Sequence, residues 1–159
     1  MKIFFLPMLV LSVAFVSFRT IDVAASLPLC DVLKAAIRDE PAEFANLKGA
    51  LATTNDDGSK DYALKISADG WPTNEYVKAA DGSTSVDIRS ESTTKEKASE
   101  LFNKTANQIA GCLGIKGNVI QAEGVEQLLV FTKDKTDVGL MLITSKGKTF
   151  VLVSVSRES

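Results

Sequence analysis

The stretch from Thr93 to Leu113 constrains the fold more than any other part of the chain, because it has the clearest helical pattern. Thr93 can act as the N-cap residue, and Glu96, three positions later, completes a capping box. Gly114 supplies a stop signal. A helix of this length extends roughly 30 Å, enough to lie across a small sheet. The residues of its predicted apolar stripe are Ala98, Leu101, Phe102, Thr105, Ile109, Cys112 and Leu113.

The first 25 residues have the pattern of a secretory signal peptide. A lysine at position 2 precedes an almost continuous apolar run over residues 3–18, and Val23-Ala24-Ala25 places small or compact residues before a cut at Ser26. We therefore expect an exported protein, in the periplasm or outside the cell. Residues 1–25 would be removed, and residues 26–159 would form a single α+β domain.

Two other interpretations of this region are open. A membrane anchor is one, although the apolar run rises only about 24 Å as a helix, short of the roughly 30 Å hydrocarbon core. A lipoprotein signal at Leu27-Pro28-Leu29-Cys30 is the other, although the residue before its cysteine is not small. We expect no stable membrane span after cleavage. The net charge of −2, without a basic cluster, indicates no nucleic-acid partner.

Cys30 and Cys112 are predicted to form a disulfide, because an even pair of cysteines in an exported protein is most simply a bridge. Cys30 lies near the start of the first predicted helix and Cys112 near the end of the second. Two antiparallel helices side by side would bring these ends together. The alternatives are two buried free thiols and a redox pair, which would ordinarily need Cys-x-x-Cys spacing.

An earlier helix is predicted to begin at Ser26, a good N-cap residue. Pro41 cannot continue the hydrogen-bond ladder, so this helix stops or bends near Asp39. A short turn from Pro41 to Leu47 follows, and Gly49 ends it.

The chain then changes from a helical to an alternating pattern. Asp57-Gly58, Asp69-Gly70 and Asp81-Gly82 recur every twelve residues, and Asp-Gly turns at this spacing indicate a β-meander. Leu51 belongs to a short first strand. The other predicted strands of this run are centred on residues 62–66, 76–79 and 86–88.

A second run of strands follows the long helix. Leu128 to Phe131 and Leu140 to Ile143 are apolar at consecutive positions, so both faces of these strands should be covered, which places them at the centre of the sheet. The predicted strands of this run are residues 119–120, 125–132, 138–144 and 149–155.

The order of elements predicts the fold class. It runs from one helix through three or four strands to a second helix and three or four further strands. Strands joined by hairpins exclude a parallel doubly wound sheet. We expect an α+β fold with one antiparallel β-sheet and two helices packed on one face.

Several spaced residues resemble those of small exported bacterial proteins without assigned function. These are Cys30-x-x-Leu33, Phe44-x-x-Leu47-x-Gly49, a strand region that bears tryptophan, and a helix that ends at Cys112-Leu113. The layout of these proteins is similar to that of the secretion-chaperone-like α+β fold. The resemblance implies a fold and a compartment, and no catalytic residues.

The sequence contains no pattern that indicates catalysis. It has no histidine, which removes the commonest general base, the usual partner of a catalytic serine or cysteine, and the commonest metal ligand. The acidic loop from Asn55 to Asp61 lacks the glutamate that an EF-hand needs, because the sixth residue after Gly58 is Leu64. A Ser-Lys dyad and an enzyme of unfamiliar type stay open, but we expect no cofactor and no metal.

The best candidate for a contact surface is aromatic. Trp71 lies in a turn before Pro72, and Tyr62 and Tyr76 lie on the flanking predicted strands. A rigid loop that displays these rings would suit a peptide, a sugar or an apolar ligand. The alternative is that Trp71 covers one end of the core.

Two functions follow as hypotheses. The first is a non-enzymatic interaction module that binds an unknown protein or peptide, on its sheet face or along the loop containing Trp71. The second is a carrier or sensor of a small apolar ligand held between the sheet and the helices.

Overall fold

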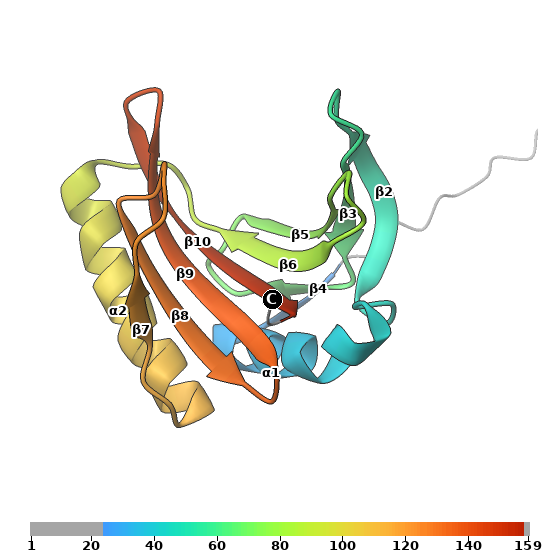
Figure 1. Ribbon diagram of the computed structural model, residues 1–159, viewed down its shortest axis with the longest axis horizontal. Coiled ribbons are helices and arrows are strands. Elements are labelled where there is room, and N and C mark those ends of the chain that lie inside the picture. The colour runs from blue at the N-terminus through green and yellow to red at the C-terminus, as the bar shows by residue number, and fades with distance from the viewer. Residues whose placement is uncertain (1–23, 158–159) are drawn as a thin grey trace, which may run out of the picture.

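The computed structural model describes residues 24–157. Of the predicted signal peptide, residues 1–25, all but the last two residues lie outside the described residues (Figure 1). The elements in order are β1 (Ala25–Leu27), α1 (Leu29–Asp39), the 3-10 helix η1 (Glu40–Ala42), β2 (Lys48–Thr54), β3 (Lys60–Leu64), β4 (Ile66–Ala68), β5 (Thr73–Lys78), β6 (Thr84–Arg89), α2 (Lys95–Leu113), β7 (Asn118–Ile120), β8 (Gln127–Lys133), β9 (Thr136–Ser145) and β10 (Lys148–Arg157).

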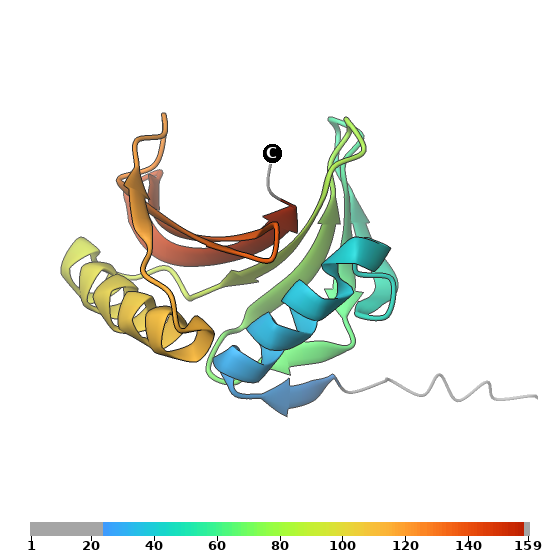
Figure 2. The same cartoon turned by 60° about the horizontal axis from the view of Figure 1, so that its bottom comes forward.

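A large antiparallel sheet dominates the fold. Its eight strands lie in the order β2-β3-β5-β6-β10-β9-β8-β7, and β1 and β4 form a separate two-stranded parallel sheet. Figure 2 shows that the large sheet is strongly curved, with α1 and α2 on its convex side. The protein is therefore an α+β protein built on a large antiparallel sheet. Within the described residues, no helix is both long enough and apolar enough to cross a membrane.

The hydrophobic core lies between the helices and the convex side of the sheet. Strand residues alternate in burial, as a sheet with one covered face requires. Val151, Val153 and Val155 of β10 are fully buried, while the residues between them are partly exposed. From the helices, Leu33 and Ile109 are fully buried in the same cluster.

The order of strands differs from the prediction in the first run. Five strands, rather than three or four, separate α1 from α2, and β1 precedes α1. The predicted strand over residues 62–66 is two strands, because the chain leaves the large sheet after Leu64. Residues Ile66–Ala68 pair instead with β1.

The starts of both helices also differ from the prediction. Ser26 is extended because it pairs with Ser67, so α1 begins only after Pro28. The N-cap of α2 is Thr94, which accepts a hydrogen bond from the Lys97 amide, because Thr93 forms a β-bridge with Thr149.

The helix ends near Asp39 and at Gly114 are confirmed, and Gly114 has a left-handed φ of 69°. Gly49, however, does not end a turn. It lies inside β2, where a Cβ atom would come within 2.6 Å of the Ala63 carbonyl oxygen.

The disulfide between Cys30 and Cys112 is confirmed, with 5.7 Å between the two Cα atoms. The expected arrangement of the helices is wrong in one respect. Figures 1 and 2 show that α1 and α2 diverge from the end where they are joined, rather than running side by side. The curved sheet explains this, because each helix follows a different part of the convex side.

Replacing both cysteines with serine is expected to lower the free energy of unfolding by about 2–5 kcal/mol. The bond joins residues 82 positions apart, so its loss frees a long loop in the unfolded chain. Denaturant unfolding of the oxidised wild-type protein and the double variant measures the difference. Intact mass after alkylation without reductant is the control, and two alkylated cysteines in the wild-type protein would contradict the bond.

Candidate functional site

The concave face of the sheet is the candidate site, because three of its strands are apolar on both faces while the helices cover only one. In β9, Val138, Leu140 and Leu142 are buried beneath the helices. Met141 and Ile143 alternate with them and are partly exposed on the opposite face. Figure 2 shows no described element lying over that face.

These partly exposed apolar side chains form a continuous surface because their strands are paired in register. Ile120 pairs with Leu128, Leu128 with Met141, and Met141 with Leu152, which makes one row across β7, β8, β9 and β10. Phe150 pairs with Ile143 beside this row. We call this surface the apolar patch; its residues are Ile120, Leu128, Val130, Met141, Ile143, Phe150 and Leu152.

The expected position of these strands is wrong. Apolar residues at consecutive positions predicted that β8 and β9 would lie at the centre of the sheet with both faces covered. The centre is instead the pairing of β6 with β10, and β8 is next to the edge strand β7. The second apolar face is therefore a surface feature, and exposed apolar patches of this kind mark interaction sites.

The other half of the concave face is acidic. Asp87 of β6 pairs with Glu75 of β5, and Asp61 of β3 pairs with Val77 on the same face. We call Asp61, Glu75 and Asp87 the acidic cluster. All three are partly buried, so their charges are screened less than those of fully exposed carboxylates.

The pKa values of two members are raised. Burial is the largest cause for both Asp87 and Glu75, and the neighbouring charge of Asp61 adds to it. A hydrogen bond of 2.6 Å from the Ser154 hydroxyl to Asp87 opposes the rise. The nearby Arg89 also opposes it in both residues.

Arg89 does not neutralise the acidic cluster by direct contact. Its guanidinium carbon lies 5.6 Å from the centre of the Phe150 ring, a cation–π arrangement at the border of the apolar patch. Within residues 24–157, the ion pairs are Lys95–Glu126 and Arg157–Glu40. The carboxylates of the cluster therefore have no ion-pair partner among the described residues. No group of three or more potential ligands there could hold a metal ion.

The predicted aromatic surface is divided between two places. Tyr62 and Tyr76 pack edge to face with their ring centres 5.4 Å apart, and Tyr76 is 3% exposed against Phe44. Lys48 lies above the Tyr62 ring at 3.8 Å. These tyrosines therefore belong to the core and its border.

Trp71 lies elsewhere, in the turn between β4 and β5. It is partly buried against the core and lines a shallow groove of about 620 Å³ with Pro72 and Leu101. Neither tyrosine lines this groove. The structure does not bring the three predicted rings to one surface.

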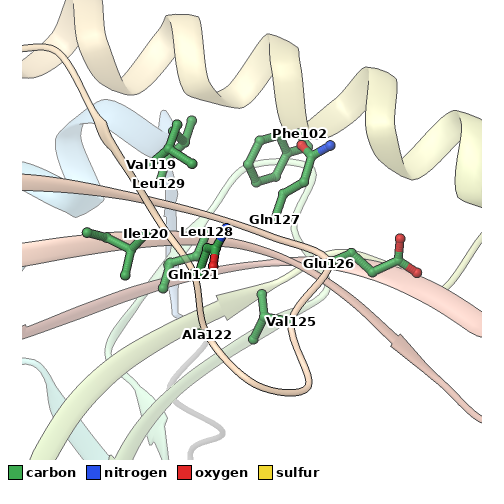
Figure 3. Close-up of a pocket in the computed structure, with 10 residues that line it drawn as sticks. All are labelled: Phe102, Val119, Ile120, Gln121, Ala122, Val125, Glu126, Gln127, Leu128 and Leu129. Atoms are coloured by element: carbon green, nitrogen blue, oxygen red, sulfur yellow. The ribbon is translucent and has the colours of Figure 1, made fainter.

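A second pocket lies at the β7 edge of the large sheet, between α2 and the loop from β7 to β8 (Figure 3). Its volume is about 570 Å³. In Figure 3 Phe102 approaches from the helix, and the Glu126 carboxylate turns away from the apolar side chains. We call this the edge pocket; it is lined by Phe102, Val119, Ile120, Gln121, Ala122, Val125, Glu126, Gln127, Leu128 and Leu129.

Neither half of the concave face was predicted from the sequence, although the signal was present. Asp61, Glu75 and Asp87 alternate with core residues of their strands, so the period of two placed them on the uncovered face. These carboxylates converge because β3, β5 and β6 are neighbours in the large sheet. That strand order could not be deduced from the sequence.

Comparison with known protein families, with curated proteins and with solved structures finds no match to this chain. The resemblance to small exported bacterial proteins therefore stays a prediction, and the function must be argued from the site itself.

Glu75→Gln is expected to raise the melting temperature near neutral pH by about 1–3 °C. Because the pKa of Glu75 is raised, the folded protein holds this proton more tightly than the unfolded chain. The stability contributed by the protonated form is present below about pH 4 and is lost as the pH rises through the folded-state pKa. The advantage of the variant should therefore be largest at neutral pH and disappear in acid.

Melting curves recorded across this pH range check the effect. Glu100→Gln, an exposed position on α2, is the matched control and should show no such trend. A neutral-pH melting temperature lower for Glu75→Gln than for the wild-type protein would contradict the destabilising role of this charge.

Proposed function

We propose that this chain is an exported interaction module that binds a segment of another polypeptide on the concave face of its sheet, without catalysing a reaction. The observation that carries this proposal is the apolar patch, which lies opposite a core that the helices already cover. Covering these side chains would remove apolar surface from water at roughly 25 cal/mol per Å², which is the usual driving force for association.

The shape of the patch favours a polypeptide over a small molecule. The row from Ile120 to Leu152 crosses four neighbouring strands, about 14 Å in all at the spacing of a sheet. A small molecule on this open face would remain exposed on one side. A folded or folding segment presents several side chains at once and excludes water from the whole row.

The absence of histidine from the sequence favours binding over catalysis. The concave face carries carboxylates, a serine and an arginine, but the usual base for activating a nucleophile is missing from the chain.

Met141→Asp is expected to weaken binding of a peptide selected on this protein by at least about tenfold, because it buries a charge in the middle of the apolar row. Selection from a displayed random-peptide library on the oxidised wild-type protein supplies the ligand, and calorimetry measures its dissociation constant. Gln108→Asp, at an exposed position of α2, is the matched control and should bind as the wild-type protein does.

Amide exchange locates the bound peptide independently of the variants. Protection should increase in β8, β9 and β10. Selected peptides that bind the Met141→Asp and wild-type proteins equally, without protecting these strands, would overturn the proposed function.

The edge pocket favours a second candidate function, that of a carrier or sensor of a small apolar ligand. Its volume of about 570 Å³ lies within the range of small-molecule sites. Val119 is 80% exposed and Ile120 is 45% exposed, so the mouth presents apolar surface to solvent. The Glu126 carboxylate is engaged by Lys95 and by the Thr144 hydroxyl, which leaves glutamine amides as the polar lining and suits a neutral ligand.

Ala122→Trp is expected to fill the edge pocket and to weaken binding of the neutral apolar dye N-phenyl-1-naphthylamine by about tenfold or more. Fluorescence titration measures the affinity, and native mass spectrometry of freshly purified protein tests for a retained small molecule. Ala80→Trp, in an exposed turn away from the pocket, is the matched control. Equal dye binding by both variants and the wild-type protein would exclude this pocket as the site.

A further inference from the structure

We propose that the segment bound on the concave face is a basic amphipathic helix, with its apolar side on the apolar patch and its lysine or arginine side chains over the acidic cluster. This inference rests on the proposed function and adds the chemistry of the partner.

The two halves of the concave face meet along the centre of the sheet. The apolar patch occupies β7 to β10, and the acidic cluster occupies β3, β5 and β6. The two halves join where β10 pairs with β6, and Ser154 lies opposite Asp87 at this junction. A segment lying along these central strands would therefore have the apolar patch on one flank and the acidic cluster on the other, and Asp137, which pairs with Ser156, adds a carboxylate on the apolar flank.

The carboxylates are available to a cation from outside the protein. The two ion pairs of the described residues involve Glu126 and Glu40, and Arg89 is placed over Phe150. Partly buried and unpaired negative charge beside an apolar surface attracts a partner with the opposite charge and rejects one with the same charge.

The backbone of the sheet favours a helix over an extended segment. Each interior strand is paired on both sides, so a strand laid across the face would find no free backbone groups. A helix satisfies its own backbone hydrogen bonds and presents only side chains. The strands β9 and β10 have ten residues each, about 33 Å, which accommodates a helix of about 18 residues, roughly 27 Å long.

Three synthetic peptides test the inference. Each has about 18 residues and the same helical stripe of leucine, and the opposite side is lysine, glutamate or glutamine. Calorimetry with the oxidised wild-type protein should give an affinity for the lysine peptide on the order of tenfold higher than for the glutamate peptide, with the glutamine peptide between them.

Two double variants separate local attraction from the overall charge of the protein. Glu75→Gln with Asp87→Asn should reduce the preference for lysine to about threefold or less, because Asp61 is then the one member of the acidic cluster that keeps its charge. Glu96→Gln with Glu100→Gln makes the same change of charge on the exposed side of α2 and should leave the preference unchanged. Melting curves verify that both double variants are folded.

The other outcomes each overturn the inference in a recognisable way. A lysine preference that Glu75→Gln with Asp87→Asn leaves undiminished would overturn it. Equal affinity for all three peptides, weakened in each case by Met141→Asp, would overturn the charge selectivity while leaving the proposed function intact. Sedimentation of the protein alone adds one more outcome: a dimer that Met141→Asp dissolves would overturn the inference by assigning this face to a second copy. Failure of all three peptides to bind would overturn it as well, and the library selection would then decide the proposed function by itself.

Discussion

Packing of one face of β9 and β10 against the helices is the interaction on which the rest of the structure depends. These two strands pair over their full length of ten residues and contribute much of the buried core. The helices can cover only one side of them. The helices and the core lie on the convex side of the curved sheet, and the uncovered side is concave (Figure 2).

The face that the helices leave uncovered has an unusual composition. A sheet with one solvated face usually carries polar residues there. On β8, β9 and β10 the solvated face is apolar, while on β5 and β6 it carries carboxylates whose pKa is raised by burial. The apolar side chains on the solvated face and the partly buried carboxylates both lower the stability of the isolated chain, which is common where residues serve binding.

Much of the local structure could be predicted from the sequence, because it depends on neighbours in the chain. The Asp-Gly turns have glycines with positive φ, the C-cap at Gly114 is left-handed, and the strands after α2 lie close to their predicted ranges. The disulfide could be predicted because the chain has only two cysteines to pair. The start of α1 could not be predicted in this way, because Ser26 is a good N-cap residue that pairs with a distant strand instead.

The candidate site was harder to predict, because it depends on strand order. Leu128 and Met141 carried a correct signal, a strand apolar on both faces, but the signal has two explanations: a second buried layer or an exposed binding surface. Only the arrangement of the helices distinguishes them. Trp71 and Tyr62 show the converse difficulty, since they are near in sequence but β4, which lies between them in the chain, belongs to the other sheet.

The disulfide has a mechanical consequence for the concave face. Within the large sheet, β2, β3, β5 and β6 form one half and β7 to β10 form the other, and the two halves join where β6 pairs with β10. Cys30 lies in α1, which precedes the first half in the chain, and Cys112 lies in α2, which precedes the second half. Their bond therefore links the segments before the two halves covalently. Without this bond, the two halves would be joined by the pairing of β6 with β10 and by the hydrophobic core that both halves share.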